Sequence, residues 1–198
     1  GTPYMKVTNI TWKIGGEAGY GIQTSGNIFS RSFSKKGYHV IDNIEYPSLI
    51  RGGHNTFTSR INSGPIYSIN RDINILAALD TDTIKRHQEE VAYGGYIIYE
   101  EEEGRQNKSN NIRKDIKYIN VPFRRIASEK GLPEVMINNI AIGASMALVS
   151  HDLQTAKDTI NEVFRDKGPE SAVSNIKALE LGCKYVKEKL GIKAYEME

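Results

Sequence analysis

The sequence predicts an α/β fold with a mostly parallel sheet, and three patterns in its 198 residues indicate this. Residues 8–14 alternate apolar and polar side chains, as a strand does, and lead into a glycine-rich turn and a helical pattern over 22–36. A second strand at 38–42 completes a β-α-β unit, which favours parallel strands. Residues 73–79 form an apolar run that is typical of a strand buried on both faces.

Strands and helices continue along the rest of the chain. The expected elements are a strand at 55–61 that turns at 62–65 into another at 66–69, a helix from 80 to 91 closed by Gly94 and Gly95, strands at 96–99 and 116–121, and helices at 123–130, 135–150, 155–166 and 170–190. We therefore expect an antiparallel hairpin over 55–69. The small residues of the 135–150 helix let another helix approach closely, so this helix is either the deepest core element or a subunit contact.

Composition indicates a single globular domain over residues 1–198, in which the polar, asparagine-rich segment 104–114 is expected to be a flexible loop. The net charge of +2 argues against nucleic acid as a partner. A single cysteine, Cys183, excludes internal disulfides and a multi-cysteine zinc or iron–sulfur site within the chain, and no metal ligands are assigned. No apolar run approaches the roughly 20 residues of a membrane span, so we expect a cytoplasmic protein.

The first candidate binding stretch is the glycine-rich segment 15–21, Gly-Gly-Glu-Ala-Gly-Tyr-Gly, with Gly16, Gly19 and Gly21 as candidate binding residues. A turn between a strand and a helix N-terminus offers free backbone N–H groups and the positive end of the helix dipole to an anion. The glycine order differs from the dinucleotide fingerprint, although Asp42 ends the second strand about where a ribose-binding acid would lie. Three interpretations stay open: a phosphate or pyrophosphate site, a tight turn without a ligand, and a nicotinamide site.

The second candidate stretch, residues 45–55, reads Glu-Tyr-Pro-Ser-Leu-Ile-Arg-Gly-Gly-His-Asn and has no secondary-structure period. Irregular loops between strands are where binding groups concentrate, although a solvated turn is an equal alternative. The guanidinium of an arginine makes planar two-point contacts with a phosphate or a carboxylate. A histidine here either takes part in acid–base chemistry or only forms hydrogen bonds with nearby backbone groups. The candidate binding residues of this loop are Arg51, Gly52, Gly53, His54 and Asn55.

Five ordered motifs carry a family resemblance: GGEAGYG, EYPSLIRGGHN, INILAALD, GGYIIYE and NNIAIGA. Over roughly residues 7–191 they closely resemble the gamma subunit or gamma domain of 2-oxoacid:ferredoxin oxidoreductases of the pyruvate, ketoisovalerate and 2-oxoglutarate type. The resemblance implies a three-layer, Rossmann-like α/β/α sandwich with a mostly parallel central sheet and an antiparallel hairpin.

The resemblance also implies a function. Enzymes of this family convert a 2-oxoacid and CoA to acyl-CoA and CO₂ and pass electrons to ferredoxin, using thiamine diphosphate, magnesium and [4Fe–4S] clusters. The diphosphate–magnesium motif and the cluster cysteines are missing from this chain, so we assign it no catalytic residue, expect it to be inactive alone, and place those cofactors in partner subunits. It is expected to contact CoA and to assemble with alpha and beta subunits or domains in a homo- or hetero-oligomer that meets ferredoxin through the complex. The alternatives are a nucleotide-binding Rossmann dehydrogenase and a purely structural assembly module.

Overall fold

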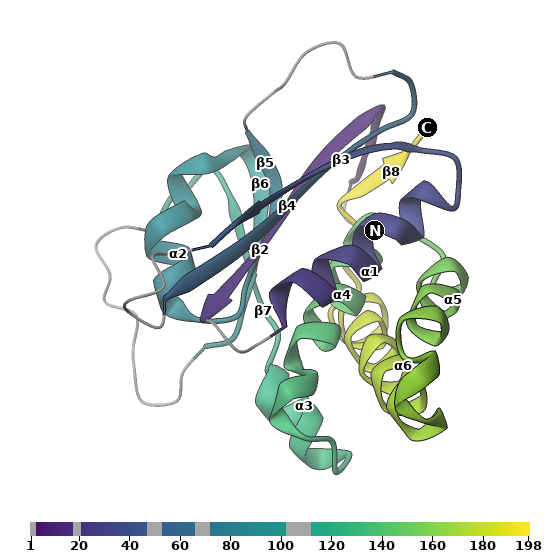
Figure 1. The fold of residues 1–198 in the computed structure, drawn as a ribbon. Coiled ribbons are helices and arrows are strands. Elements are labelled where there is room, and N and C mark those ends of the chain that lie inside the picture. Colours follow the sequence, from purple (N-terminus) through teal and green to yellow (C-terminus); the bar gives the residue numbers. More distant parts are fainter. Residues whose placement is uncertain (1–2, 18–20, 47–52, 66–71, 102–111) are drawn as a thin grey trace.

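A computed structural model describes residues 3–17, 21–46, 53–65, 72–101 and 112–198, which form one layered α/β unit (Figure 1). Within these residues a six-stranded sheet has the order β3-β4-β2-β5-β6-β7. Its strands are β2 (Asn9–Glu17), β3 (His39–Glu45), β4 (His54–Asn62), β5 (Ile73–Ala78), β6 (Val91–Tyr99) and β7 (Lys117–Asn120). The short strands β1 (Met5–Val7) and β8 (Tyr195–Met197), which the sequence patterns missed, form a separate parallel pair that joins the two ends of the chain.

The sheet is mostly parallel, as predicted. Strands β2, β5, β6 and β7 pair in parallel, whereas β4 runs antiparallel to both of its neighbours, β2 and β3. The first β-α-β unit therefore returns β3 parallel to β2 but one strand away, and β4 fills the space between them. The antiparallel hairpin is thus β3–β4. The second strand of the hairpin that we expected, 66–69, lies outside the described residues.

Helices cover both faces of the sheet, which confirms the three-layer α/β/α sandwich (Figure 1). They are α1 (Ile22–Ser34), α2 (Thr81–His87), α3 (Phe123–Glu129), α4 (Ile137–Leu148), α5 (Gln154–Val163) and α6 (Pro169–Lys184). Helix α6 continues as a short π-helix, Tyr185–Leu190. Helices α1 and α4 lie on one face and α2 on the other, with α5 and α6 outside α1 and α4. No helix in the described ranges is long and apolar enough to cross a membrane.

Helix α4 is the deepest helix of the fold, because all twelve of its residues are buried. It crosses α6 at two glycines, where a Cβ on Gly143 would lie 1.9 Å from the carbonyl oxygen of Leu179 and a Cβ on Gly182 would lie 1.9 Å from that of Ile140. The small residues therefore serve a close contact between two helices of the same chain. Of the two interpretations left open by the sequence, the structure supports the core element.

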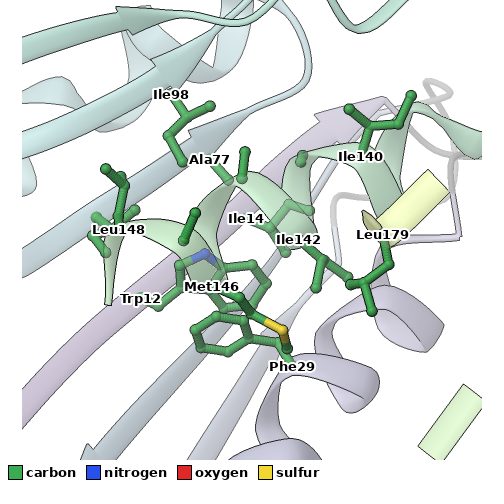
Figure 2. Close-up of a cluster of buried hydrophobic side chains, with 14 of the residues drawn as sticks. Trp12, Ile14, Phe29, Ala77, Ile98, Ile140, Ile142, Met146, Leu148 and Leu179 are labelled. Carbon is green, nitrogen blue, oxygen red and sulfur yellow. The ribbon is translucent and has the colours of Figure 1, made fainter. Parts of the chain in front are cut away.

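The main core lies between the sheet and α4, around Trp12 of β2 (Figure 2). The Trp12 ring stacks on Phe29 of α1 with centroids 4.0 Å apart, and its indole N–H donates to the hydroxyl of Ser145 on α4 at 3.0 Å. A Cβ on Gly26 would lie 2.2 Å from the ring of Phe57, so this glycine lets α1 lie directly on β4. The alternating pattern of residues 8–14 thus fixes which face of the sheet α1 and α4 cover.

Two element boundaries differ from the prediction. Helix α2 ends at His87 and continues as a 3₁₀ turn, Gln88–Glu90, and Gly94 and Gly95 lie inside β6 instead of closing the helix. The pairing of Val91 with Ile73 starts β6 early, and Gly94 then takes a φ of 76° where the register shifts. A Cβ on Gly95 would lie 3.0 Å from the carbonyl oxygen of Asn74, so the strands approach closely here. The glycines mark an irregular strand and not a helix end.

Candidate functional site

The structure brings the two candidate stretches together at one end of the sheet. In the β2–β4 ladder Gly16 lies opposite Asn55, and Glu17 lies opposite His54. The hydroxyl of Tyr46, at the start of the second stretch, donates to the side-chain oxygen of Gln23 in the first turn of α1 at 2.7 Å. This convergence joins residues about forty positions apart in sequence, and the sequence patterns did not predict it.

The structure describes five of the eight candidate binding residues, namely Gly16, Gly21, Gly53, His54 and Asn55. The other three, Gly19, Arg51 and Gly52, lie outside the described residues, so their assignment stays a prediction. Gly53 directly precedes β4, and His54 and Asn55 are its first two residues.

The glycine-rich segment begins as the end of a strand, and its last residue, Gly21, is the N-cap of α1. Gly15 and Gly16 belong to β2, where a Cβ on Gly16 would lie 3.1 Å from the Cβ of Leu79 and 3.5 Å from Ile22. A Cβ on Gly15 would lie 2.7 Å from Thr83 on the opposite face. These two glycines leave room for the neighbouring side chains. Gly21, with a φ of 68°, makes the turn into α1. The prediction of a glycine loop over 15–21 was therefore wrong for its first three residues, because β2 extends to Glu17.

The N-terminus of α1 has the chemistry expected of an anion-binding helix end. Its N-cap, Gly21, provides no side-chain acceptor, and the first turn carries no acidic residue. The helix dipole and the free N–H groups of that turn therefore favour a negative ligand. Asn138, in the first turn of α4, lies directly beneath and donates to the hydroxyl of Ser25 at 2.6 Å, which fixes the two helices to each other.

A chain of four polar side chains lies on the opposite face of β2 at the same end of the sheet. The ammonium of Lys13 donates to one oxygen of Glu90 at 2.6 Å, and the other Glu90 oxygen contacts Nδ1 of His87. The Nε2 atom of His87 lies 2.8 Å from the Nε2 of His54, and the two rings stack with centroids 4.9 Å apart. The Nδ1 atom of His54 is buried and has no hydrogen-bond partner among the described residues. An unpaired buried polar atom costs roughly 1–3 kcal/mol.

Electrostatics favour one charge state for two of these side chains, Glu90 and His54. Burial alone would raise the pKa of Glu90, but its hydrogen bonds to Lys13 and His87 outweigh burial and lower it, so the carboxylate is ionised. Burial and the neighbouring His87 lower the pKa of His54, so its neutral form is favoured. The Asp80 carboxylate, which caps α2 by accepting from the backbone N–H of Thr83 at 2.9 Å, acts against these two effects.

Sequence reasoning missed the roles of Lys13, His87 and Glu90. Lys13 is one of the polar residues in the alternating pattern of β2, yet its side chain is only 8% exposed. The spacing of His87 and Glu90, three apart, places both on one side of a helical turn, which was the available signal. On the same face Lys13, Glu90 and Arg60 line a polar pocket of about 380 Å³.

The geometry at Asp42 does not support a nicotinamide site. Asp42 lies in the middle of β3, where its carboxylate accepts from the hydroxyl of Ser30 at 2.6 Å, and the strand continues to Glu45. In a dinucleotide fold the ribose-binding acid ends the strand next to the first one, whereas here β4 separates β3 from β2. The order of the glycines and the order of the strands therefore both argue against a nicotinamide site.

Among the described residues, the donor groups do not fit the metal centres that the resemblance implies. In the described ranges no group of three or more histidine, cysteine, aspartate or glutamate side chains is placed to hold a metal ion. A [4Fe–4S] cluster needs four cysteines, and the sequence has one, Cys183, on α6, where burial raises the pKa of its thiol. We therefore derive no chemistry on this chain from such a cluster.

Known proteins resemble the chain in sequence and in fold. The 2-oxoacid:ferredoxin oxidoreductase subunit alpha of Saccharolobus solfataricus is 31% identical over 159 residues, which cover 80% of this chain and 22% of that protein. The structure of 2-oxoglutarate:ferredoxin oxidoreductase from Magnetococcus marinus, with 2-oxoglutarate, coenzyme A and succinyl-CoA bound, superposes with a TM-score of 0.85 at 20% identity, covering 98% of this chain and 33% of that one. The gamma subunit of a keto/oxoacid ferredoxin oxidoreductase from Geobacter sulfurreducens superposes with a TM-score of 0.71 at 18% identity, covering 89% of this chain and 95% of that one.

The chain thus spans about a fifth of the length of the curated relative. At 18–20% identity the two structures show a shared fold. The family described as pyruvate ferredoxin/flavodoxin oxidoreductase matches residues 11–185, which include both candidate stretches and, apart from the first two residues of β2, the strands of the large sheet. On this match the chain belongs to the pyruvate ferredoxin/flavodoxin oxidoreductase family.

Proposed function

We propose that the chain is the gamma component of a 2-oxoacid:ferredoxin oxidoreductase, which oxidatively decarboxylates a 2-oxoacid with CoA to acyl-CoA and CO₂ and reduces ferredoxin. In this proposal the chain is not catalytic alone; it forms part of the CoA side of the site and the interfaces with alpha and beta subunits or domains. Thiamine diphosphate, magnesium and the [4Fe–4S] clusters belong to those partners, in a cytoplasmic oligomer.

One observation carries the CoA part of the proposal: the two candidate stretches converge at one end of the sheet. There the uncapped N-terminus of α1 lies beside the start of β4, through the Gly16–Asn55 register and the contact between Tyr46 and Gln23. A helix N-terminus of this kind suits a phosphate, and CoA carries three phosphate groups. The Magnetococcus protein of the same fold has coenzyme A bound in its structure, which supports the same ligand class here.

The assembled enzyme with Arg51 replaced by alanine is expected to bind CoA about ten- to a hundredfold more weakly. Arg51 lies just before the described start of β4, and a charge-assisted contact is worth roughly 1.5–3 kcal/mol. The measurement is the dependence of turnover on CoA concentration, together with thermal melting of the isolated chain. The matched control is Arg31→Ala, which removes an exposed arginine from the last turn of α1.

The free energy of unfolding of the isolated Arg51→Ala chain should stay within about 0.5 kcal/mol of that of the parent chain, because in this proposal the arginine contacts a ligand and not its own chain. Arg31→Ala should leave both CoA affinity and stability unchanged. If Arg51→Ala instead unfolds the isolated chain while the assembled enzyme keeps its CoA affinity, the arginine is structural and the CoA proposal fails.

The purified chain without partners should show no turnover of any 2-oxoacid with CoA and a low-potential electron acceptor. The chain has one cysteine, which cannot hold a [4Fe–4S] cluster. It also lacks the diphosphate–magnesium motif of a thiamine site. The measurement is acceptor reduction by the isolated chain, and by the same preparation after addition of alpha and beta partners. Turnover by the chain alone would overturn the assignment of all the chemistry to the partners.

A further inference from the structure

Strand β3 is an open edge of the large sheet. Among the described residues its only neighbouring strand is β4, so about half of its backbone N–H and C=O groups point away from the sheet. Five of its seven residues are exposed, namely His39, Ile41, Asp42, Asn43 and Glu45. Ile41 is apolar and 45% exposed. Such a strand can pair with a strand of another chain.

The other edge strand, β7, has features that hinder such pairing, whereas β3 lacks them. Strand β7 has four residues, begins with the exposed Lys117, and is followed closely by Pro122. Strand β3 has seven residues and contains neither lysine nor proline. Its register with β4 runs without a bulge from His39 to Glu45. Short length, lysine, proline and bulges are common protections of an edge strand, so β3 is the edge that is suited to pairing.

The sequence of β3 is complementary to itself in antiparallel pairing. With a two-fold axis through Asp42, perpendicular to the sheet, all seven residues of each strand face a residue of the other copy. An axis through the residue before or after Asp42 pairs only five, 39–43 or 41–45. The axis through Asp42 places His39 opposite Glu45 of the second copy at both ends of the paired strands. An imidazole N–H donates to a carboxylate, so these two contacts are favourable.

The same register also matches the apolar residues. Val40 lies opposite Ile44 of the second copy, and both pack against the main core of their own chain. The two exposed Ile41 side chains become diagonal neighbours on the other face of the joined sheet. One contact is unfavourable, because the two Asp42 carboxylates face each other at the axis. Each of them accepts a hydrogen bond from Ser30 of its own chain at 2.6 Å, which holds it against α1.

We propose that β3 is a dimer interface, at which two copies of this chain pair antiparallel about an axis through Asp42 and join their large sheets. The interface does not depend on the proposed CoA contact. It has a consequence for the candidate site, because Glu45 begins the second candidate stretch, 45–55. The pairing places His39 of the second copy beside the start of that stretch, and the stretches of the two copies lie at opposite ends of the paired strands.

Dimer formation is tested by analytical ultracentrifugation of the full chain over a wide range of concentrations, where we expect a monomer–dimer equilibrium. Ile41→Lys places two ammonium groups near the axis and should raise the Kd of the dimer about tenfold or more. The matched control is Val173→Lys, which replaces an apolar residue of α6 that is 67% exposed, and it should leave the Kd unchanged. A monomer at every concentration, or equal effects of the two substitutions, would overturn the proposal.

Asp42→Asn tests the register, and it is expected to strengthen the dimer. The amide oxygen still accepts from Ser30, whereas the two facing negative charges are removed, so the Kd should fall about fivefold. Because this variant gains affinity, its result does not depend on whether Ile41→Lys folds. A Kd that is unchanged or higher in Asp42→Asn contradicts an axis through Asp42.

Disulfide cross-linking tests the same axis in a chain that carries Cys183→Ser. Residues directly opposite each other in antiparallel strands have Cα atoms roughly 4.5–5.5 Å apart, which suits a disulfide, so Asp42→Cys should join two copies on oxidation. Ile41→Cys should not, because diagonal neighbours lie roughly 7–8 Å apart. Cross-linking through Ile41→Cys and not through Asp42→Cys would overturn the register.

Hydrogen exchange separates a second copy from a different partner strand. We expect the outward backbone amides of β3 to exchange more slowly as the concentration of the chain alone is raised. Amides that are protected only after alpha or beta partners are added would overturn the second copy as the occupant and assign the edge to a partner.

Discussion

Replacing Gly143 by alanine is expected to lower the free energy of unfolding by at least about 3 kcal/mol. The new methyl group would lie 1.9 Å from the carbonyl oxygen of Leu179 and 2.8 Å from its carbonyl carbon, which are backbone atoms of α6. No rotamer change relieves such a contact, so α4 and α6 must separate. Alanine has a higher helix propensity than glycine by about 1 kcal/mol, and this gain is too small to compensate.

The measurement is urea and thermal unfolding of the full chain, in which a loss of this size lowers the melting temperature by about 10 °C. Gly182→Ala should have the same effect, because its methyl group would lie 1.9 Å from the carbonyl oxygen of Ile140. Gly64→Ala is the matched control, since nothing lies within 4 Å of its Cβ position. Stability of Gly143→Ala close to that of Gly64→Ala would show that α4 and α6 do not cross as closely as described.

The stability of the chain is expected to fall by about 3 kcal/mol between pH 6.5 and about pH 4 through His151 alone. Burial and the charge of Lys36 lower the pKa of His151 from 6.5 to about 4. Its ring stacks on Phe33 with centroids 4.0 Å apart, and its Nε2 lies 2.7 Å from the hydroxyl of Ser32. In this pH range His151 binds a proton in the unfolded chain but not in the folded chain, so acid favours unfolding. The contribution is fully present above pH 6.5 and is lost as the pH falls.

The measurement is the free energy of unfolding across this pH range for the parent chain and for His151→Gln. The difference between the two profiles cancels the other titrating groups, including His54 and the carboxylates. It should change by about 3 kcal/mol from one end of the range to the other, with the parent chain losing more stability in acid. Two parallel profiles would mean that His151 titrates alike in the folded and unfolded chains.

Local patterns were enough to predict much of the fold. The alternation around Trp12 predicted β2 and its buried face, and the helical spacing that includes Phe29 and Phe33 predicted α1, because the period of each pattern matches the geometry of one element. The apolar run 73–79 predicted a central strand, and β5 indeed lies between β2 and β6. The order of the motifs was also sufficient to predict the family.

Only the tertiary structure decided where these elements meet. The sequence gives no register between strands, so the pairing of Gly16 with Asn55, and the position of β4 between β2 and β3, could not be predicted. The small residues of α4 suited either a core or an interface, and the choice depended on whether α6 of the same chain covers them.

The candidate site shows the same division. The sequence alone determined that the residues 15–21 and 45–55 are rich in turn-forming and polar groups that suit a ligand, and that one cysteine cannot hold a cluster. The tertiary structure decided that His54 meets His87, which lies 33 positions away, and that Lys13 meets Glu90, which lies 77 positions away. The physical reason is that secondary structure follows from interactions within a few residues, whereas a tautomer or a buried charge depends on neighbours that only chain packing brings within about 3 Å.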